Sequence, residues 1–128
     1  GAGSAHLGLP GDVTPPSRFV RAAFYQATAP QQETTHAAVL QAFQIMNNFD
    51  IPIGIEHSDT AHMPEGLPSA TQWTTATDLD ALRIYYRTAW NSAIRCIDLK
   101  TINFQKVKFQ ACPLDQVTEQ PVEMIRIK

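Results

Sequence analysis

The sequence contains little cysteine, which excludes the small protein classes that depend on several disulfides or on zinc. Its two cysteines, Cys96 and Cys112, are too few for a disulfide scaffold and form neither a CxxC pair nor a spaced zinc set. One bridge between them stays open at this point. Cys96 lies in an alternating, strand-like stretch, where we expect a small buried side chain, and we assign neither thiol as a nucleophile.

Long apolar runs and an excess of charge are also absent. No run approaches the ~18 residues that span a bilayer, and 10 Lys and Arg residues oppose 12 Asp and Glu residues, for a net charge of −2. This balance argues against the basic footprint of nucleic-acid-binding proteins and the polybasic surface of membrane-bound ones. We therefore expect no nucleic-acid partner and no membrane association. With 44% hydrophobic residues, the 128-residue chain fits one globular domain or a piece of one.

Basic residues are missing from one long stretch of the chain. No Lys or Arg lies between Arg21 and Arg83, a stretch that carries seven acidic residues, whereas eight basic and four acidic residues lie from Arg83 onward. Two interpretations stay open. The asymmetry reflects two solvated faces of different charge, or it forms an electrostatic docking surface for an acidic partner.

Two helices are predicted in the first half of the chain. The sequence Thr14-Pro15-Pro16-Ser17 is typical of a helix start, since Thr14 can cap free amide groups and Pro15 suits the first helical position. Apolar residues then recur at helical spacing until Pro30 separates this helix from the next. A second helix should run from about residue 33 to 48. Its apolar face is formed by Val39, Leu40, Phe43 and Met46.

The period then changes to two residues, which is typical of strands. Three stretches alternate in this way, namely residues 72–77, 82–90 and 94–99. Short connections at 78–81 and 91–92 join them into a three-stranded antiparallel meander. We predict two further strands, near 106–110 and 122–127. Helices followed by a sheet make the predicted fold class α+β.

The connection between the helices and the sheet, residues 51–70, is long for a loop inside one domain, which favours a functional role. It contains imidazole and carboxylate groups of the kind that bind divalent ions, namely His57, Asp59, His62, Glu56 and Glu65. Their spacing does not match a helical HExxH site, and the prolines and glycines of the loop give no fixed geometry. We interpret it as a polar surface loop and predict neither a metal nor a cofactor.

Two arginines at the start of the first helix need an explanation. Arg18 and Arg21 lie three residues apart and so are neighbours on one side of the helix, near the positive end of its dipole. A cation there costs about 0.3–1 kcal/mol unless a partner offsets it. Either Asp12 is that partner and the arginines are structural, or one guanidinium reaches a buried polar site or an anion.

A longer pattern around these arginines resembles a known family. The segments Gly8-Leu9-Pro10-Gly11-Asp12, Thr14-Pro15 and Ser17-Arg18-Phe19-Val20-Arg21-Ala22-Ala23-Phe24 are similar to the signature of the choloylglycine hydrolases, which include bile salt hydrolases and penicillin V acylases. Softer similarities occur at residues 42–45, 49–54, 72–76 and 83–88. The resemblance covers nearly all of residues 1–128. The opening Gly1-Ala2-Gly3 also fits, so we expect it to be native, and we expect this chain to begin after the start of its gene.

The resemblance implies that the chain is the C-terminal part of an N-terminal nucleophile hydrolase, an αββα sandwich with two stacked antiparallel sheets between helical layers. In that family a cysteine at the processed N-terminus attacks the amide carbonyl. Its own α-amino group, which titrates near ~7.7–8.0, serves as the base. The chain lacks that cysteine, so we expect no catalysis by the chain alone. By resemblance, Arg18 is a catalytic residue beside the cysteine.

The resemblance also implies a substrate class and a location. The proline pattern of residues 14–16 and 49–52 is similar to that of Gram-negative penicillin V acylases, which are exported to the periplasm and include acylases of N-acyl-homoserine lactones. We expect an enzyme that hydrolyses a small linear amide, penicillin V or an acyl-homoserine lactone. The alternatives are a bile salt hydrolase and a non-catalytic binding or interaction domain. Exposed apolar residues of the isolated sheet predict homo-oligomers or association with the missing N-terminal part.

Overall fold

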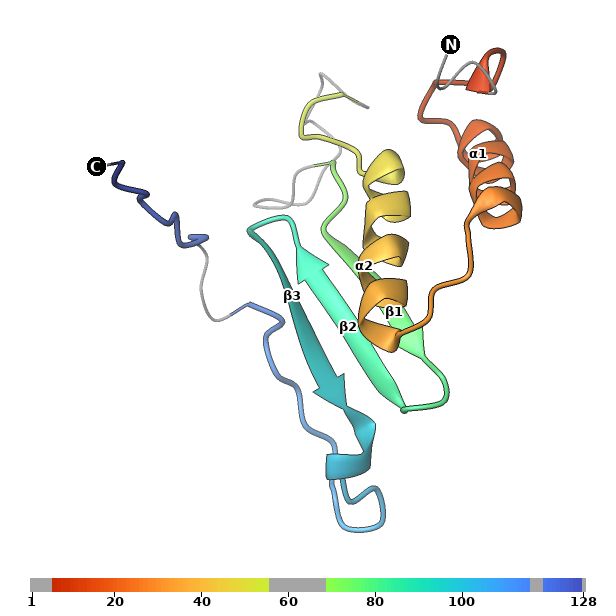
Figure 1. The fold of residues 1–128 in the computed structure, drawn as a ribbon. Helices are drawn as coiled ribbons and strands as arrows, with labels where there is room; N and C mark the ends of the chain where they lie inside the picture. Colours follow the sequence, from red (N-terminus) through yellow and green to blue (C-terminus); the bar gives the residue numbers. More distant parts are fainter. Residues whose placement is uncertain (1–5, 56–68, 116–118, 128) are drawn as a thin grey trace. The chain divides into compact units, whose positions relative to one another are not determined.

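The computed structural model describes residues 6–55, 69–115 and 119–127, and the chain divides into two compact units (Figure 1). The first unit, residues 1–70, contains the helices, and the second, residues 71–128, contains the sheet. Two helices followed by a three-stranded antiparallel sheet confirm the predicted α+β class. No helix in these described ranges combines the length and the apolar character that crossing a bilayer requires.

Helix α1 spans Pro15–Thr28 and begins where the sequence predicts, with prolines in its first two positions. The predicted side-chain cap by Thr14 is wrong. Thr14 occupies the N-cap position, but its side chain accepts no hydrogen bond from a helix amide. Its hydroxyl donates to the Ser17 hydroxyl instead. Because the two prolines carry no N–H group, the first turn has few free amides for a cap to bind.

Helix α2 spans Thr35–Met46 and lies inside the predicted range of 33–48. The Thr34 hydroxyl caps it by accepting a hydrogen bond from the Ala37 amide at 3.2 Å. A short 3₁₀ helix, η2 at Asn47–Phe49, follows directly. The predicted apolar face is confirmed at Phe43, which is buried, and is wrong at Leu40, which is 40% exposed.

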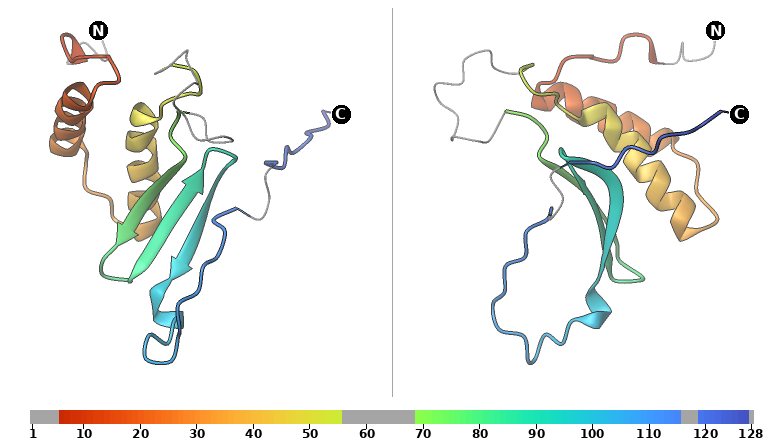
Figure 2. Two further views of the ribbon diagram at one scale, coloured as in Figure 1. Left: turned by 180° about the vertical axis from the view of Figure 1, so that it is seen from behind. Right: turned by 90° about the vertical axis from the view of Figure 1, so that its left-hand side faces the viewer.

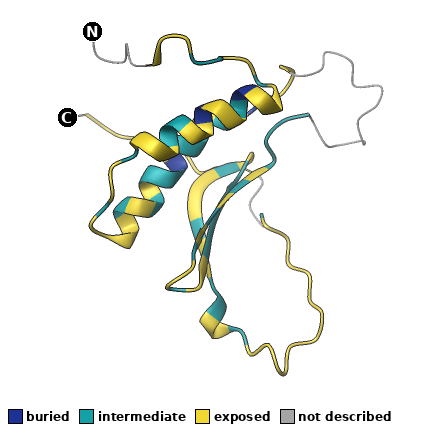
Figure 3. Cartoon of the chain, turned by 90° about the vertical axis from the view of Figure 1, so that its right-hand side faces the viewer, coloured by how far each residue is buried: buried dark blue, intermediate teal, exposed yellow. Residues whose placement is uncertain are grey.

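Aromatic rings join α1 to the short helix η2 and to the segment before α1. The Tyr25 ring of α1 meets the Phe49 ring edge to face, with centroids 6.0 Å apart, and the His6 ring lies 5.1 Å from that of Phe24. Among the described residues, the buried apolar side chains are those of Phe43 and Ile51. Figure 3 shows buried positions in this unit and none on the strands. The small core of the described residues therefore belongs to the first unit.

The sheet consists of β1 at Trp73–Asp78, β2 at Arg83–Thr88 and β3 at Asn91–Asp98. The strands are antiparallel and lie side by side in chain order, as the predicted meander requires (Figure 2). The second connection differs from the prediction. It is a two-residue turn formed by residues 89 and 90, and the predicted connection at 91–92 is already the start of β3.

The two further strands predicted near 106–110 and 122–127 are wrong. Neither segment forms a strand, and apolar side chains on both face solvent, with Phe109 96% and Ile127 95% exposed. A strand needs a neighbouring strand to bind its amides and carbonyls. Within the described residues, β3 pairs with β2 alone, so the alternating pattern of these segments has no ladder to join.

Both cysteines are free and exposed, so the bridge that the sequence left open is not formed. The prediction that Cys96 is buried is therefore wrong. Its strand, β3, lies at the edge of the sheet, where few neighbours cover a small side chain.

Candidate functional site

The loop before α1 and the first two turns of that helix share a cluster of polar groups, which we name the Asp12 network. Its members are Pro10, Asp12, Thr14, Ser17 and Arg21. The Asp12 carboxylate accepts two hydrogen bonds, from the Thr14 amide at 2.8 Å and from the Ser17 hydroxyl at 2.6 Å. Because the Ser17 side chain is buried, the second bond joins the exposed loop to the inner side of the helix.

Arg21 completes the network from the second turn of the helix. One guanidinium nitrogen donates to the backbone carbonyls of Pro10 and Asp12, both at 2.7 Å. The guanidinium carbon lies 5.6 Å from the centroid of the Phe49 ring, and the residue as a whole is buried. The structural interpretation of Arg21 is therefore confirmed. Asp12 is its partner through the backbone carbonyl oxygen rather than through the carboxylate.

Arg18 differs from Arg21 in its surroundings. Its amide donates to the Thr14 carbonyl at 3.0 Å, which begins the hydrogen-bond ladder of α1. Its side chain is half-buried, and none of the described residues offers its guanidinium a hydrogen bond or an ion pair. The Asp12 carboxylate binds Thr14 and Ser17 instead. The geometry therefore gives no support to Asp12 as a direct ion-pair partner of Arg18.

The charge at this helix start is set by Asp12 as well as by the arginines. Hydrogen bonds from the Ser17 hydroxyl and from Thr14 lower the pKa of Asp12 from 3.8 to about 2. The carboxylate is thus ionised at neutral pH. A negative charge near the N-terminus of a helix is favourable, and here it offsets two cations that the dipole disfavours.

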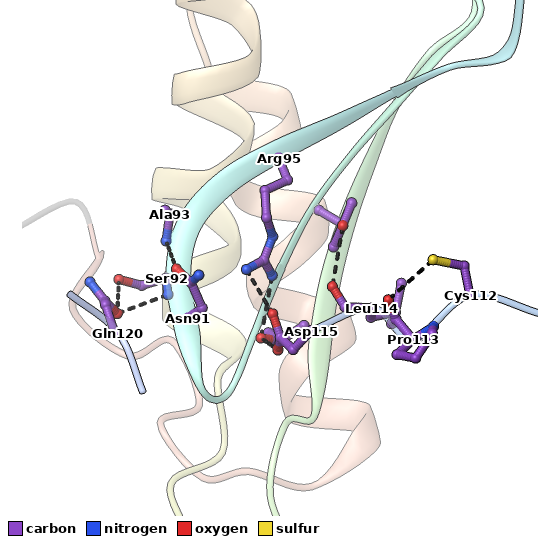
Figure 4. A network of polar contacts seen from close by, with 11 residues as sticks. Asn91, Ser92, Ala93, Arg95, Cys112, Pro113, Leu114, Asp115 and Gln120 are labelled. Atoms are coloured by element: carbon purple, nitrogen blue, oxygen red, sulfur yellow. Dashed lines mark hydrogen bonds and ion pairs between the residues drawn. The ribbon is translucent and has the colours of Figure 1, made fainter. Parts of the chain in front are cut away.

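A second polar cluster lies in the sheet unit and was not predicted from the sequence (Figure 4). We name it the Arg95 network, after Arg95 on β3. Its Nη1 lies 2.7 Å from Oδ1 of Asp115, and its other terminal nitrogen donates to the Thr88 hydroxyl at 3.3 Å. The Thr88 hydroxyl in turn donates to Asp115. The guanidinium lies over the Tyr86 ring, 4.7 Å from its centroid, and the Tyr86 hydroxyl donates to the Leu114 carbonyl.

A cleft of about 270 Å³ lies beside the Arg95 network, lined by Tyr86, Asn91, Arg95 and residues 112–115. The two opposite charges in its wall bind each other, while Nε of Arg95 has no hydrogen-bond partner among the described residues. The cross-strand register explains half of this arrangement, because Tyr86 and Arg95 are directly paired positions. No local sequence pattern predicts that Asp115 pairs with Arg95, because Asp115 lies 20 positions further along the chain.

The predicted polar loop residues, His57, Asp59, His62, Glu56 and Glu65, lie outside the described residues, so the interpretation of that loop stays a prediction. In the described ranges, no three His, Cys, Asp or Glu side chains gather closely enough to hold a metal ion.

Comparison with known proteins gives consistent matches. The family model for linear amide C–N hydrolases of the choloylglycine hydrolase family matches residues 1–116. A bile salt hydrolase/transferase from Lactiplantibacillus plantarum is 31% identical over 112 residues, which are 88% of this chain and 33% of that protein. A penicillin V acylase from Pectobacterium atrosepticum is 30% identical over 119 residues, with 84% of this chain and 30% of that protein covered.

A solved structure gives the same match in three dimensions. The crystal structure of a mutant conjugated bile acid hydrolase from Clostridium perfringens superposes with a TM-score of 0.71 and 25% identity, covering 98% of this chain and 36% of that one. The chain thus spans about a third of the length of the relatives that it matches. The identities of 31% and 30% do not separate the two activities, so the expected similarity to the penicillin V acylase branch stays a prediction.

Proposed function

The chain belongs to the choloylglycine hydrolase family of linear amide C–N hydrolases, and we propose that it is the C-terminal part of an enzyme that cleaves a small amide through a cysteine nucleophile. The observation that carries the proposal is the family match, which extends over residues 1–116. We call the longer protein the parent enzyme. The parent enzyme's nucleophile belongs to the part of the fold that precedes this chain. This chain contributes Arg18.

The proposed chemistry has two steps. The thiol of an N-terminal cysteine gives its proton to the α-amino group, and the sulfur attacks the amide carbonyl. The tetrahedral intermediate collapses to a thioester as the C–N bond breaks, and the amine leaves with the proton. Water, deprotonated by the same α-amino group, then hydrolyses the thioester to the carboxylic acid and regenerates the thiol. The α-amino group suits this role because it titrates near ~7.7–8.0.

Arg18 is proposed as the catalytic residue that this chain supplies. A guanidinium close to a thiol favours the reactive thiolate. Two observations support the role: the Arg18 side chain is half-buried, and the described residues give its guanidinium no partner. Its place at the start of α1 adds the positive end of the helix dipole to the same region.

We propose penicillin V or an N-acyl-homoserine lactone as the substrate. The matches to a penicillin V acylase and to bile salt hydrolases keep a conjugated bile salt as the second candidate. A periplasmic location is proposed from the family resemblance alone. A cleavable signal sequence upstream of the cysteine, together with cell fractionation, tests it.

The decisive experiment is an assay of the parent enzyme with three substrates: penicillin V, an N-acyl-homoserine lactone and a glycine-conjugated bile salt. We expect amide hydrolysis that is lost when the N-terminal cysteine is replaced by alanine. Arg18→Ala should lower kcat at least tenfold, and Arg18→Lys should recover part of it, since an ammonium keeps the charge but not the planar fork. If no processed cysteine exists upstream, or if none of the three amides is cleaved, the chain belongs to a non-catalytic binding domain instead.

We also propose that the chain associates with the missing part of the fold or with a second copy of itself. Support comes from the apolar side chains that the isolated chain leaves in solvent, among them Trp73 at 60% and Trp90 at 46% exposure. Sedimentation of the chain alone, with melting curves at several concentrations, tests this proposal. A monomer that melts in one sharp transition, independent of concentration, would contradict it.

A further inference from the structure

We propose that Asp12, Ser17 and Arg21 are positioning residues, which fix the first turns of α1 and thereby hold the Arg18 guanidinium where the hydrolysis uses it. This inference rests on the proposed function, because it assigns these residues a task only through Arg18. None of the three touches the Arg18 guanidinium.

The positions of the three residues around Arg18 carry the inference. Ser17 directly precedes Arg18, and Arg21 follows it by about one helical turn. Ser17 donates to the Asp12 carboxylate at 2.6 Å, while Arg21 donates to the Asp12 carbonyl at 2.7 Å. A single loop residue thus restrains the helix on both sides of Arg18. Since successive helical residues differ by about 100° in direction, any unwinding of the first turn would redirect the Arg18 side chain.

The first turn needs such restraint because its own bonds are few. The ladder of α1 starts at the Arg18 amide, as in any helix with its N-cap at position 14, and the two prolines before it carry no N–H group that a cap could bind. Helix ends fray, and Thr14 supplies no side-chain cap here. The Asp12 network supplies side-chain bonds where no cap is formed, and those made by Ser17 and Arg21 start on buried residues.

The burial of Arg21 points to positioning rather than to stability alone. Its described acceptors are neutral carbonyls, and burying a cation without a carboxylate partner is costly. An apolar side chain of similar size would fill the space beside Phe49 at lower cost. What the guanidinium adds is direction, because one nitrogen binds two carbonyls of the preceding loop and fixes the angle at which the helix begins.

The test uses the parent enzyme and compares Ser17→Ala and Asp12→Asn with a matched control, Thr28→Ala. Thr28 lies at the far end of α1, and its hydroxyl also donates to a backbone carbonyl, that of Phe24, at 2.9 Å. We expect Ser17→Ala to lower kcat at least fivefold with KM changed less than twofold. Asp12→Asn keeps one carboxamide oxygen as an acceptor and should lower kcat less. Thr28→Ala should leave kcat within twofold of the unmodified enzyme.

A double-mutant cycle separates positioning from general stability. In an Arg18→Ala background, Ser17→Ala should lower kcat less than twofold further, because there is no guanidinium left to position. The alkylation rate of the N-terminal cysteine by iodoacetamide should fall in both Ser17→Ala and Arg18→Ala. This measurement needs no substrate. The same fivefold loss in both backgrounds, or normal kcat in Ser17→Ala beside an impaired Arg18→Ala, overturns the positioning role alone. Normal kcat and alkylation in Arg18→Ala overturn the proposed role of Arg18 and this inference together.

Discussion

In each of the two arginine networks, an arginine attaches an irregular segment to a helix or a strand, but the two arginines use different acceptors. Arg21 attaches the loop before α1 to the helix through two neutral carbonyls, at positions 11 and 9 residues away in the chain. Arg95 attaches the segment after the sheet to β3 through a carboxylate 20 positions away. Arg21 is buried, whereas the Arg95 side chain keeps 25% of its exposure.

The difference shows what each network contributes. The Arg21 contact closes a loop about half as long as the Arg95 contact does, which saves only about 0.6 kcal/mol of chain entropy. The Arg95 contact closes a longer stretch and depends on a matched pair of charges, whose mutual attraction is partly consumed by desolvation. We therefore expect the Arg21 contact to be the harder of the two to disrupt, because both of its acceptors belong to the backbone.

The largest effect on this comparison is expected from Arg21→Ala. Bonds from a charged donor contribute about 1.5–3 kcal/mol each, and both carbonyls would lose their partner. Because the two bonds share one nitrogen, we expect less than their sum, a loss of about 2–4 kcal/mol in unfolding free energy. Urea unfolding of the parent enzyme measures it. Arg21→Lys should recover less than half, because an ammonium lacks the planar group that lies beside the Phe49 ring. A loss below about 1 kcal/mol would mean that water replaces the guanidinium without cost.

Removing one charge of the Arg95 network should have the next largest effect. Asp115→Ala leaves a partly buried guanidinium without its carboxylate, and we expect a loss of about 1–3 kcal/mol. The double change Arg95→Met with Asp115→Leu should cost less than Asp115→Ala alone, because it removes the desolvated charges together. Hydrogen exchange at residues 111–115 gives a local measurement. Equal costs for the single and double changes would show that the pair is not what holds this segment.

Acid should weaken the Asp12 network without affecting Arg21 directly. The pKa of Asp12 is lowered to about 2 in the folded chain, so its ionised form contributes stability that is fully present above the unfolded value of 3.8 and is lost as the pH falls toward 2. The difference in melting temperature between the unmodified enzyme and Asp12→Asn should therefore be constant above about pH 5 and shrink below pH 4. A constant difference down to pH 3 would contradict the lowered pKa.

The smallest effect is expected at the exposed pair of Arg83 and Asp98, which serves as a reference for both networks. Their side chains approach to 3.1 Å but remain 45% and 30% exposed. The pKa of Asp98 is lowered first by the Lys100 amide and then by Arg83. Arg83→Ala should change the melting temperature only slightly, and raising the salt concentration should remove the change. A salt-independent loss comparable to that of Asp115→Ala would place this pair with the buried networks.

Local chemistry allowed the helices and the three strands to be predicted from the sequence. The prolines at the start of α1, the apolar spacing of α2 and the two-residue period of the strands each depend on neighbours within a few positions. Features that depend on distant partners were missed or mispredicted. Asp115 acts only because the fold brings it to Arg95, and the segments 106–110 and 122–127 alternate as strands do but have no pairing neighbour.

The candidate site follows the same rule. The family resemblance distinguished Arg18 from Arg21. The acceptors of Arg21 lie only 11 and 9 positions before it in the chain, so a contact with this loop could be expected. The bond between Asp12 and Ser17 was not predicted, because the sequence pattern favours Thr14 as the capping residue. In the structure the Thr14 side chain binds no helix amide. Two adjacent prolines remove the amides that such a cap serves, so the usual pattern was present while its physical basis was not.

The choice of carbonyl acceptors by Arg21 has a consequence for inheritance. Every residue carries a backbone carbonyl, so a mutation that changes the side chain at position 10 leaves that acceptor in place. The acceptor of Arg95 is the side chain of Asp115, which a single nucleotide change in its codon can remove. A side-chain change at position 10 therefore leaves Arg21 its acceptor, whereas the segment after the sheet can lose the acceptor of Arg95 in one mutational step.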